Sequence, residues 1–282
     1  MAELISGKIV SAKVRQDIAE EVKAFSKEHG KVPGLAVIVV GDDPASAVYV
    51  RNKHKACLEV GITSYQIEFS GDTPEEVLLS KIDELNADPK VNGILVQLPL
   101  PKHISEEKVI NRISPKKDVD AFHPENVGRI VIGNYDFLPC TPAGIIELLN
   151  YYGIEISGKS CAVVGRSNIV GKPMQMLLTE KNGTVTLCHS RTQNLGEITS
   201  GADVVVVAIG KPEFLTADMV KDGAVVIDVG INRLPDGKLV GDVKFDEVQS
   251  KASYITPVPG GVGPMTITML LKNTLTAAKK QI

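Results

Sequence analysis

Tyr49 and Lys53 stand four residues apart, well ahead of a glycine-containing loop at Gly165. Four residues are about one helical turn, so a helix would project both side chains from the same face. A phenol beside an amine can relay a proton, which suits chemistry at a carbon–nitrogen centre. A lysine such as Lys53 is, on its own, most often a solvated surface residue. The pair therefore needs support from other positions before it indicates a site.

The order of these features along the chain is informative. Short-chain dehydrogenases carry the same Tyr/Lys spacing, but in them the nucleotide loop comes first. Here Tyr49 and Lys53 precede the only convincing nucleotide loop. The order predicts a separate substrate domain followed by a cofactor domain.

Further candidates for a substrate site lie on both sides of that loop. Gln97 ends an apolar strand just before a proline pair, at the strand end where open α/β sheets place ligands, so its amide could orient a lysine or bind a heterocycle. Asp120 lies in a loop with Asp118, where a solvated turn is the ordinary interpretation. The segment 257–264 is rich in proline and glycine, which lets backbone approach a flat ligand; a simple connector is the alternative.

The candidate nucleotide loop runs from Cys161 to Pro173 and contains Gly165, Arg166 and Ser167. It leads from an apolar strand through a turn into a helix, where backbone N–H groups can hold phosphate oxygens. Its glycine spacing is not G-x-G-x-x-G, so a plain strand–turn–helix connection is the alternative.

The end of the next strand distinguishes between two cofactors. An NAD-specific domain often has a carboxylate there for the ribose 2′-hydroxyl. This chain has Ser190 and Arg191 instead, and together with Arg166 they could hold a 2′-phosphate. The pattern favours NADP over NAD, with solvated loop residues as the alternative.

The elements that must position these residues alternate between helix and strand. Helices are expected at 9–29, 45–60, 142–152 and 264–280, and Thr73–Glu76 looks like a capping box that opens a helix to about 86. Strands are expected at 35–40, 93–97, 160–164, 184–188, 203–209 and 224–229. The stretch 114–139 is loop-rich. This pattern predicts an α/β protein whose second half is a doubly wound parallel sheet.

Composition narrows the class of protein. In 282 residues, 43% are hydrophobic and the net charge is −3, which supports a full core and gives no case for nucleic acid. The four scattered cysteines and five histidines show no metal-ligand spacing, so we expect reduced thiols and no metal. No signal peptide or membrane span is visible, so we expect a soluble, cytoplasmic protein.

Five segments together resemble the bifunctional methylenetetrahydrofolate dehydrogenase/methenyltetrahydrofolate cyclohydrolase family over essentially the whole chain. The matching segments are Tyr49-x-x-x-Lys53, Val96–Pro101, Lys117–Asp120, Gly165–Ser167 with Val170–Pro173, and Thr256–Thr266. The resemblance implies oxidation of 5,10-methylenetetrahydrofolate by NADP⁺, followed by hydrolysis of the methenyl cation to 10-formyltetrahydrofolate. It also implies a place in one-carbon metabolism, which serves purine, histidine and methionine biosynthesis.

The resemblance further implies roles for particular residues. Lys53 would be essential to hydrolysis, Gln97 would tune it, Tyr49 would stack on the folate and Asp120 would anchor the pterin ring. The stretch Pro259-Gly260-Gly261 would line the folate side of the cleft. The family's NADP contacts match Gly165, Arg166, Ser167, Ser190 and Ile231.

The implied organisation is a folate-binding catalytic domain at 1–139 and 267–282, with the last helix returning to it, and a Rossmann-like NADP domain at 140–266. Family members are usually homodimers joined through the cofactor domains. One departure is Ala121, where the family usually has glycine; a positive φ there would strain the loop by roughly 1 kcal/mol.

Alternatives remain in three classes. One is a dehydrogenase with little or no cyclohydrolase activity, which the intact Lys53–Gln97 pair opposes. Another is an NADP-dependent dehydrogenase of a small polyol or keto acid, which has no use for Tyr49, Gln97 and Asp120. The last is a non-catalytic folate- or nucleotide-binding protein, which would not need Lys53.

Overall fold

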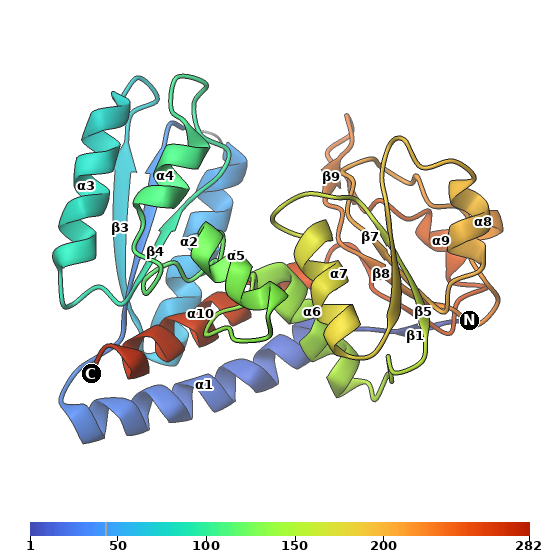
Figure 1. Cartoon of the computed structure of the whole chain (residues 1–282), viewed down its shortest axis with the longest axis horizontal. Helices are drawn as coiled ribbons and strands as arrows, with labels where there is room; N and C mark the ends of the chain where they lie inside the picture. The colour runs from blue at the N-terminus through green and yellow to red at the C-terminus, as the bar shows by residue number, and fades with distance from the viewer. Residues whose placement is uncertain (43) are drawn as a thin grey trace. The chain divides into compact units, whose positions relative to one another are not determined.

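The computed structural model describes residues 1–42 and 44–282, and the chain forms two compact units. The small-sheet unit consists of Lys13–Cys140 and Ile267–Ile282, and the large-sheet unit of Met1–Ala12 and Thr141–Thr266. Each unit has a parallel sheet with helices around it, so the predicted two-part α/β fold is confirmed (Figure 1).

The small-sheet unit is built on three parallel strands in the order β3-β2-β4. The strands are β2 (Gly34–Val40), β3 (Thr63–Phe69) and β4 (Gly93–Val96). Its helices are α1 (Gly7–His29), α2 (Pro44–Val60), α3 (Glu75–Ala87), α4 (Glu106–Arg112), α5 (Pro124–Val131) and α10 (Val262–Lys280), of which α1 and α10 begin in the large-sheet unit. Every residue of β2 is buried, as its unbroken apolar run predicts for a central parallel strand.

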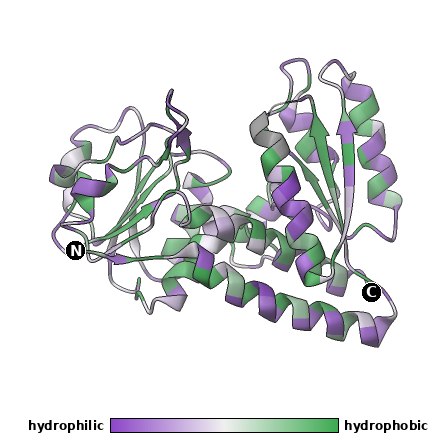
Figure 2. Ribbon diagram, turned by 180° about the vertical axis from the view of Figure 1, so that it is seen from behind, coloured by the Kyte–Doolittle hydropathy of each residue, from purple (hydrophilic) through white to green (hydrophobic). Residues whose placement is uncertain are grey.

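One side of this sheet packs against α3 and α4. Ile38 and Ile94 on the sheet share a core with Ile82 of α3 and Val109 of α4. Fully burying such a side chain stabilises the fold by about 1.5–3 kcal/mol. Strands β2 and β4 consist almost entirely of apolar residues, whereas β3 is partly hydrophilic and α1 alternates between both colours (Figure 2).

The predicted capping box at Thr73 is wrong. Helix α3 begins at Glu75, and its N-cap is Pro74, which has no side-chain acceptor to offer. The Glu75 carboxylate instead accepts hydrogen bonds from Ser105 N at 2.8 Å and Lys108 Nζ at 2.6 Å. Because Ser105 and Lys108 belong to the start of α4, this acid joins the two helices rather than capping its own.

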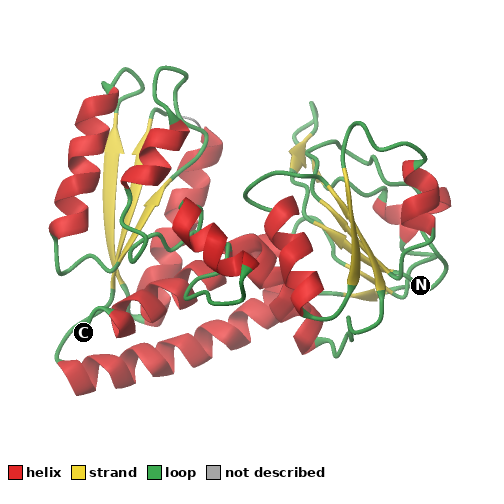
Figure 3. Ribbon diagram, in the orientation of Figure 1, coloured by secondary structure: helices red, strands yellow, loops and turns green. Residues whose placement is uncertain are grey.

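The large-sheet unit contains six parallel strands in the order β1-β11-β8-β7-β5-β6. They are β1 (Glu3–Leu4), β5 (Ser160–Val164), β6 (Thr184–Cys188), β7 (Val204–Val207), β8 (Val225–Asp228) and β11 (Tyr254–Ile255), with a separate ribbon of β9 (Asn232–Arg233) and β10 (Leu239–Val240). The helices are α6 (Cys140–Tyr151), α7 (Gly171–Glu180), α8 (Leu195–Ser200), η1 (Ala217–Met219) and α9 (Phe245–Val248). From β5 the chain adds β6 on one side and then crosses back to add β7 on the other side of β5, so the strand order reverses there, which is the switch point where such sheets bind ligands (the sheet is drawn in Figure 3).

The first residues of the chain belong to this larger sheet. Leu4 of β1 pairs with Ile255 of β11, and Ile5 N donates to Ile255 O at 2.9 Å. The sequence-based boundary instead kept residues 1–12 with the substrate domain. A two-residue strand carries no periodicity, so the pattern could not show it.

The last helix returns to the small-sheet unit from Ile267 onward, as predicted. Asn273 of α10 donates from Nδ2 to Val119 O at 2.8 Å and to Leu138 O at 2.9 Å. Arg15 Nε of α1 donates to Thr268 Oγ1 at 3.0 Å. The bond from Asn273 to Val119 ties α10 to the loop that carries Asp120, and the bond from Arg15 ties α10 to α1.

Candidate active site

The structure brings Lys53 and Gln97 together. Lys53 lies on α2 with 8% of its surface exposed, and Gln97 directly follows β4. Lys53 Nζ donates to Gln97 Oε1 at 2.9 Å. Gln97 N also donates to Ile38 O at 2.8 Å, which continues the β2–β4 pairing by one residue and fixes where the side chain starts. The predicted pair is therefore a direct contact.

The orientation of the Gln97 amide follows from its second partner. Its Nε2 donates to Leu98 O at 2.7 Å, and a carbonyl oxygen can only accept. The amide oxygen must therefore face Lys53. This oxygen is uncharged, so Gln97 holds the amine without a carboxylate's strong preference for the ammonium form.

The charge state of Lys53 is perturbed by its surroundings. Burial lowers the pKa of the Lys53 amine, and Asp120, the foremost opposing influence, raises it through its negative charge. The neighbouring thiols stay neutral, because burial raises the pKa of Cys57 to about 12 and that of Cys140 well above its usual value. The amine can thus lose its proton more readily than a solvated lysine.

Asp118 and Asp120 do not form the solvated turn that is ordinary for such a loop. Asp118 is 3% exposed, and its Oδ2 accepts from His123 N and Asn126 Nδ2, both at 2.8 Å. Asp120 is half-buried and close enough to Lys53 to influence its pKa. Asp118 therefore holds the loop, and Asp120 supplies a charge to the site.

Two neighbours complete this region. Ala121 has a φ of 58°, so an alanine occupies the left-handed conformation that glycine adopts more readily. Tyr49 lies on α2 one turn before Lys53 and is 37% exposed. Burial raises the pKa of its phenol, which remains protonated at neutral pH.

The glycine loop after β5 requires its glycines. Gly165 has a φ of 124°, and a Cβ there would lie 2.2 Å from Ala208 O. A Cβ on Gly171 would lie 2.0 Å from Gly165 O. Ser167 Oγ accepts from Val170 N at 3.2 Å and Gly171 N at 3.3 Å at the start of α7, so its own hydrogen remains to donate to a ligand oxygen.

The turn after β6 presents Ser190 and Arg191, both exposed. His189 N donates to Thr192 Oγ1 at 2.8 Å, and His189 Nδ1 accepts from Arg191 N at 3.1 Å. These bonds fix the backbone of the turn while leaving both side chains available. The donor set of a hydroxyl and a guanidinium fits a phosphate group.

The remaining predicted residues also lie in the large-sheet unit. Ile231 follows β8 and is 47% exposed. Pro259, Gly260 and Gly261 precede α10, and Gly260 has a φ of 108°. Sequence reasoning missed Gly7, whose Cβ would lie 1.7 Å from Gly261 O. No signal in the sequence marks Gly7, because the contact depends on the β1–β11 pairing.

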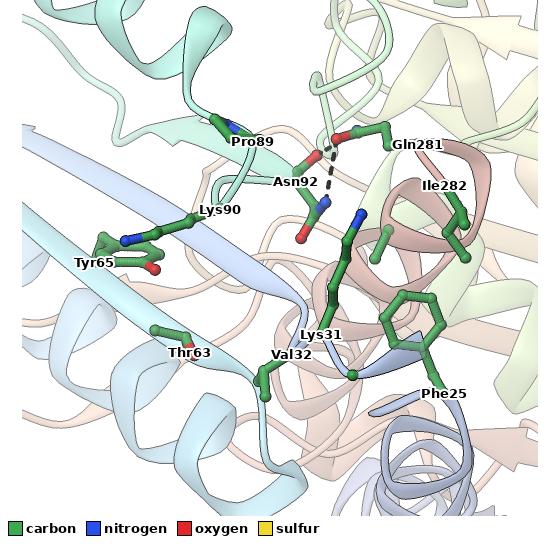
Figure 4. A pocket seen from close by; sticks show the side chains of 12 residues that line it. Phe25, Lys31, Val32, Thr63, Tyr65, Pro89, Lys90, Asn92, Gln281 and Ile282 are labelled. Carbon is green, nitrogen blue, oxygen red and sulfur yellow. Dashed lines mark hydrogen bonds between the residues drawn. The ribbon is translucent and has the colours of Figure 1, made fainter. Parts of the chain in front are cut away.

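A cavity of about 400 Å³ in the small-sheet unit lies at the opposite end of the sheet from Gln97. Its lining includes Val32, Thr63 and Asn92, at or just before the amino ends of β2, β3 and β4, whereas Gln97 follows the carboxyl end of β4. Asn92 Nδ2 already donates to Gln281 Oε1 across it at 3.2 Å (Figure 4). None of the predicted site residues lines this cavity.

Residues 1–42 and 44–282 contain neither a metal-binding cluster nor a membrane-spanning helix. No three His, Cys, Asp or Glu side chains gather there in a way that could hold a metal ion. Within the same ranges, no helix has the length and apolar character needed to cross a membrane.

The chain is similar to known proteins over its whole length. Residues 5–120 match the family described as tetrahydrofolate dehydrogenase/cyclohydrolase, catalytic domain, and residues 139–282 match the NAD(P)-binding domain of that family. The bifunctional protein FolD of Acetivibrio thermocellus is 61% identical over 280 residues, which is 99% of this chain and 98% of the relative.

Solved structures agree. The bifunctional methylenetetrahydrofolate dehydrogenase/cyclohydrolase FolD of Campylobacter jejuni is 49% identical, with a TM-score of 0.97 and full coverage of both chains. The Trypanosoma brucei enzyme, complexed with NADP and an inhibitor, is 40% identical, with a TM-score of 0.95 and coverage of 99% of this chain and 98% of that one.

Proposed function

The chain belongs to the tetrahydrofolate dehydrogenase/cyclohydrolase family, and from that premise we propose how its own residues divide the work of the two reactions. It is a bifunctional enzyme that oxidises 5,10-methylenetetrahydrofolate and hydrolyses the resulting 5,10-methenyltetrahydrofolate. The Lys53–Gln97 hydrogen bond of 2.9 Å is the observation that carries the assignment of residues.

The dehydrogenase step uses NADP rather than NAD. Bound at the switch point, NADP⁺ supplies the hydride acceptor. Arg191 and Ser190 after β6, together with Arg166 after β5, bind its 2′-phosphate, since these exposed groups follow adjacent strands of one sheet. The hydroxyl of Ser167 donates to a phosphate oxygen near Gly165, and Ile231 packs against the cofactor. The relative from Trypanosoma brucei, whose structure contains NADP, supports this choice.

The cyclohydrolase step uses Lys53 as a general base. The methenyl substrate is a cation, which disfavours a second positive charge beside it and lowers the pKa of Lys53 beyond the effect of burial. The neutral amine takes a proton from the water that attacks the cation. Gln97 keeps Nζ in place with an uncharged oxygen, so the lone pair on Nζ stays available for this proton.

In the small-sheet unit, the folate is held by residues beside this pair. Asp120 accepts from the N–H groups of the pterin ring, and the protonated phenol of Tyr49 stacks on the folate. In the large-sheet unit, we assign a contact with the folate to the backbone at Pro259, Gly260 and Gly261, because the absence of side chains on the two glycines permits close approach.

We also propose a cytoplasmic homodimer joined through the cofactor domains. The four cysteines are unpaired and buried, which fits a reducing compartment. Strand β6 is an edge of the six-stranded sheet, where pairing with a second copy would satisfy open backbone groups. Light scattering coupled to gel filtration gives the mass directly, and a monomer at micromolar concentration contradicts the dimer.

An absorbance assay tests the function. Wild-type protein with 5,10-methylenetetrahydrofolate and NADP⁺ should form the methenyl compound and then consume it. Lys53→Met should abolish hydrolysis of added methenyltetrahydrofolate, whereas Lys55→Met, an exposed lysine on the same helix, should not. Near wild-type hydrolysis by Lys53→Met would show that the base lies elsewhere. Oxidation without hydrolysis in the wild type would favour the dehydrogenase-only alternative.

A further inference from the structure

Two buried aspartates of the large-sheet unit have no part in the reactions as assigned so far. Asp228 ends β8 and is 2% exposed, and Asp242 follows β10 and is 0% exposed. Burial raises the pKa of the Asp228 carboxyl to about 7. Burying two neighbouring carboxyl groups is costly unless their oxygens accept hydrogen bonds. Their partners therefore indicate what the pair is for.

Asp242 binds the backbone after β7. Its Oδ2 accepts from Ile209 N at 2.7 Å and Gly210 N at 3.0 Å, and its Oδ1 accepts from Lys211 N at 2.9 Å. Oδ1 also accepts from Asn232 Nδ2 at 2.9 Å, beyond β8. One side chain thus fixes two successive loops at the carboxyl edge of the sheet.

Asp228 in turn fixes Asp242. Its Oδ1 accepts from Asp242 N at 2.9 Å and Gly230 N at 3.0 Å, and its Oδ2 accepts from Val243 N at 2.9 Å. The two carboxylates therefore form one chain of bonds from β8 to the loop after β7.

The backbone packs closely around these two carboxyl groups. A Cβ on Gly230 would lie 2.2 Å from Asp242 Oδ1, and a Cβ on Gly241 would lie 1.8 Å from Asp228 Oδ2. Both glycines are needed for the carboxylates to approach the backbone so closely. The loops are therefore held in one arrangement.

The loops held by Asp242 follow β7 and β8, on the far side of the switch point from β6. If the 2′-phosphate end of the cofactor lies at β5 and β6, the nicotinamide end must lie over β7 and β8. The N–H groups at Ile209, Gly210 and Lys211 are already used by Asp242, so they do not hold the pyrophosphate. Their hydrogen bonds to Asp242 instead hold this backbone rigid beside the nicotinamide end of the cofactor.

We propose that Asp242, supported by Asp228, is a positioning residue for hydride transfer that fixes the backbone against which the nicotinamide end of the cofactor lies. This inference rests on the proposed NADP site. It places the carboxylates behind the loops, where they act through backbone geometry and do not touch the cofactor.

The two activities of the enzyme provide the test. Asp242→Asn removes one acceptor oxygen and puts an amide N–H₂ against backbone N–H groups. We expect the KM for NADP⁺ to rise and the dehydrogenase kcat to fall. Together these changes should lower kcat/KM by about 10- to 100-fold, as for a misplaced reactant. Hydrolysis of added methenyltetrahydrofolate, which depends on Lys53, should stay within about twofold of wild type. Asp246→Asn, an exposed acid of α9, is the matched control.

Amide hydrogen exchange links the kinetic change to the loop. In Asp242→Asn, exchange should quicken in the peptide containing Ile209, Gly210 and Lys211. Faster exchange there with an unchanged kcat/KM for NADP⁺ would overturn the proposal, and so would a parallel loss of both activities in a folded protein. If Asp242→Asn fails to fold, Asn232→Ala, which removes one donor to Asp242, must lower dehydrogenase kcat/KM selectively. A wild type without NADP-dependent oxidation would sink the proposed function itself, a separate outcome.

Discussion

Gln97 presents Lys53 with an amide oxygen at 2.9 Å where an acid of nearly the same shape could stand. A carboxylate at this position would favour the ammonium form and raise the pKa of Lys53, typically by about 1 to 3 units for an opposite charge at this distance. The uncharged amide leaves burial as the dominant influence, and burial lowers the pKa.

Gln97→Glu should therefore move the pH dependence of hydrolysis. With Lys53 as a base, the rate of hydrolysis increases as pH rises through the lysine's pKa. A higher pKa shifts this rising part of the pH–rate profile to a pH about 1 to 3 units higher. Hydrolysis at pH 7 should fall much more than hydrolysis at pH 9 to 10. Stopped-flow absorbance over a pH series measures this, with Gln66→Glu, exposed on β3, as the control. An unshifted pH–rate profile would mean that Lys53 does not titrate in the reaction.

Arg166 and Arg191 should determine the choice of cofactor. Replacing both by Ala removes charge-assisted bonds that contribute roughly 1.5–3 kcal/mol each, so the KM for NADP⁺ should rise by at least about 100-fold. The KM for NAD⁺, which lacks the 2′-phosphate, should change little. Steady-state kinetics with both cofactors measure the ratio, and Arg233→Ala, an exposed arginine of the same unit, should leave it unchanged. Equal increases for the two cofactors would remove the 2′-phosphate assignment.

The parts of the fold that the sequence predicted are those with strong apolar runs. Strands β5 and β6 lie at the predicted residues, because their runs are bounded by clear turns. The polar, half-exposed strand β3 and the short helices α4 and α5 were not predicted, since they are held by tertiary contacts such as Glu75 with Lys108.

Residues of the candidate site divide in the same way, into those that a local pattern indicates and those that depend on tertiary contacts. Lys53 and Gln97 could be singled out because they lie on a predicted helix and at a predicted strand end, whereas Asp120 lies in a loop and was singled out as a site residue by the family resemblance. The role of Asp242 depends on bonds between distant segments, such as the bond that Ile209 N donates to it, and no local pattern encodes those.

Gly7 should resist replacement although it is helical. Alanine normally stabilises a helix by about 1 kcal/mol relative to glycine, but a Cβ on Gly7 would lie 1.7 Å from Gly261 O. Gly7→Ala must therefore displace the Pro259–Gly261 backbone, lowering stability by about 1–3 kcal/mol and raising the KM for the folate substrate. Gly128→Ala is the control, since a Cβ on this helical glycine of α5 would meet no atom within 4 Å, and it should gain up to about 1 kcal/mol. Thermal unfolding and folate kinetics distinguish the two, and equal gains in stability would contradict the contact.

Ala121 carries backbone strain beside Asp120, and glycine should relieve it. Its φ of 58° costs about 1–2 kcal/mol for an L-residue, while removal of its buried methyl costs about 0.8 kcal/mol. Ala121→Gly should therefore leave the free energy of unfolding within about 1 kcal/mol of wild type. Ala277→Gly, equally buried but inside α10, loses the same methyl and adds a helix penalty, so it should lose about 2 kcal/mol. Denaturant unfolding of both variants gives the difference. If Ala121→Gly is as destabilising as Ala277→Gly, the left-handed alanine is not strained, and any change in folate affinity must have another cause.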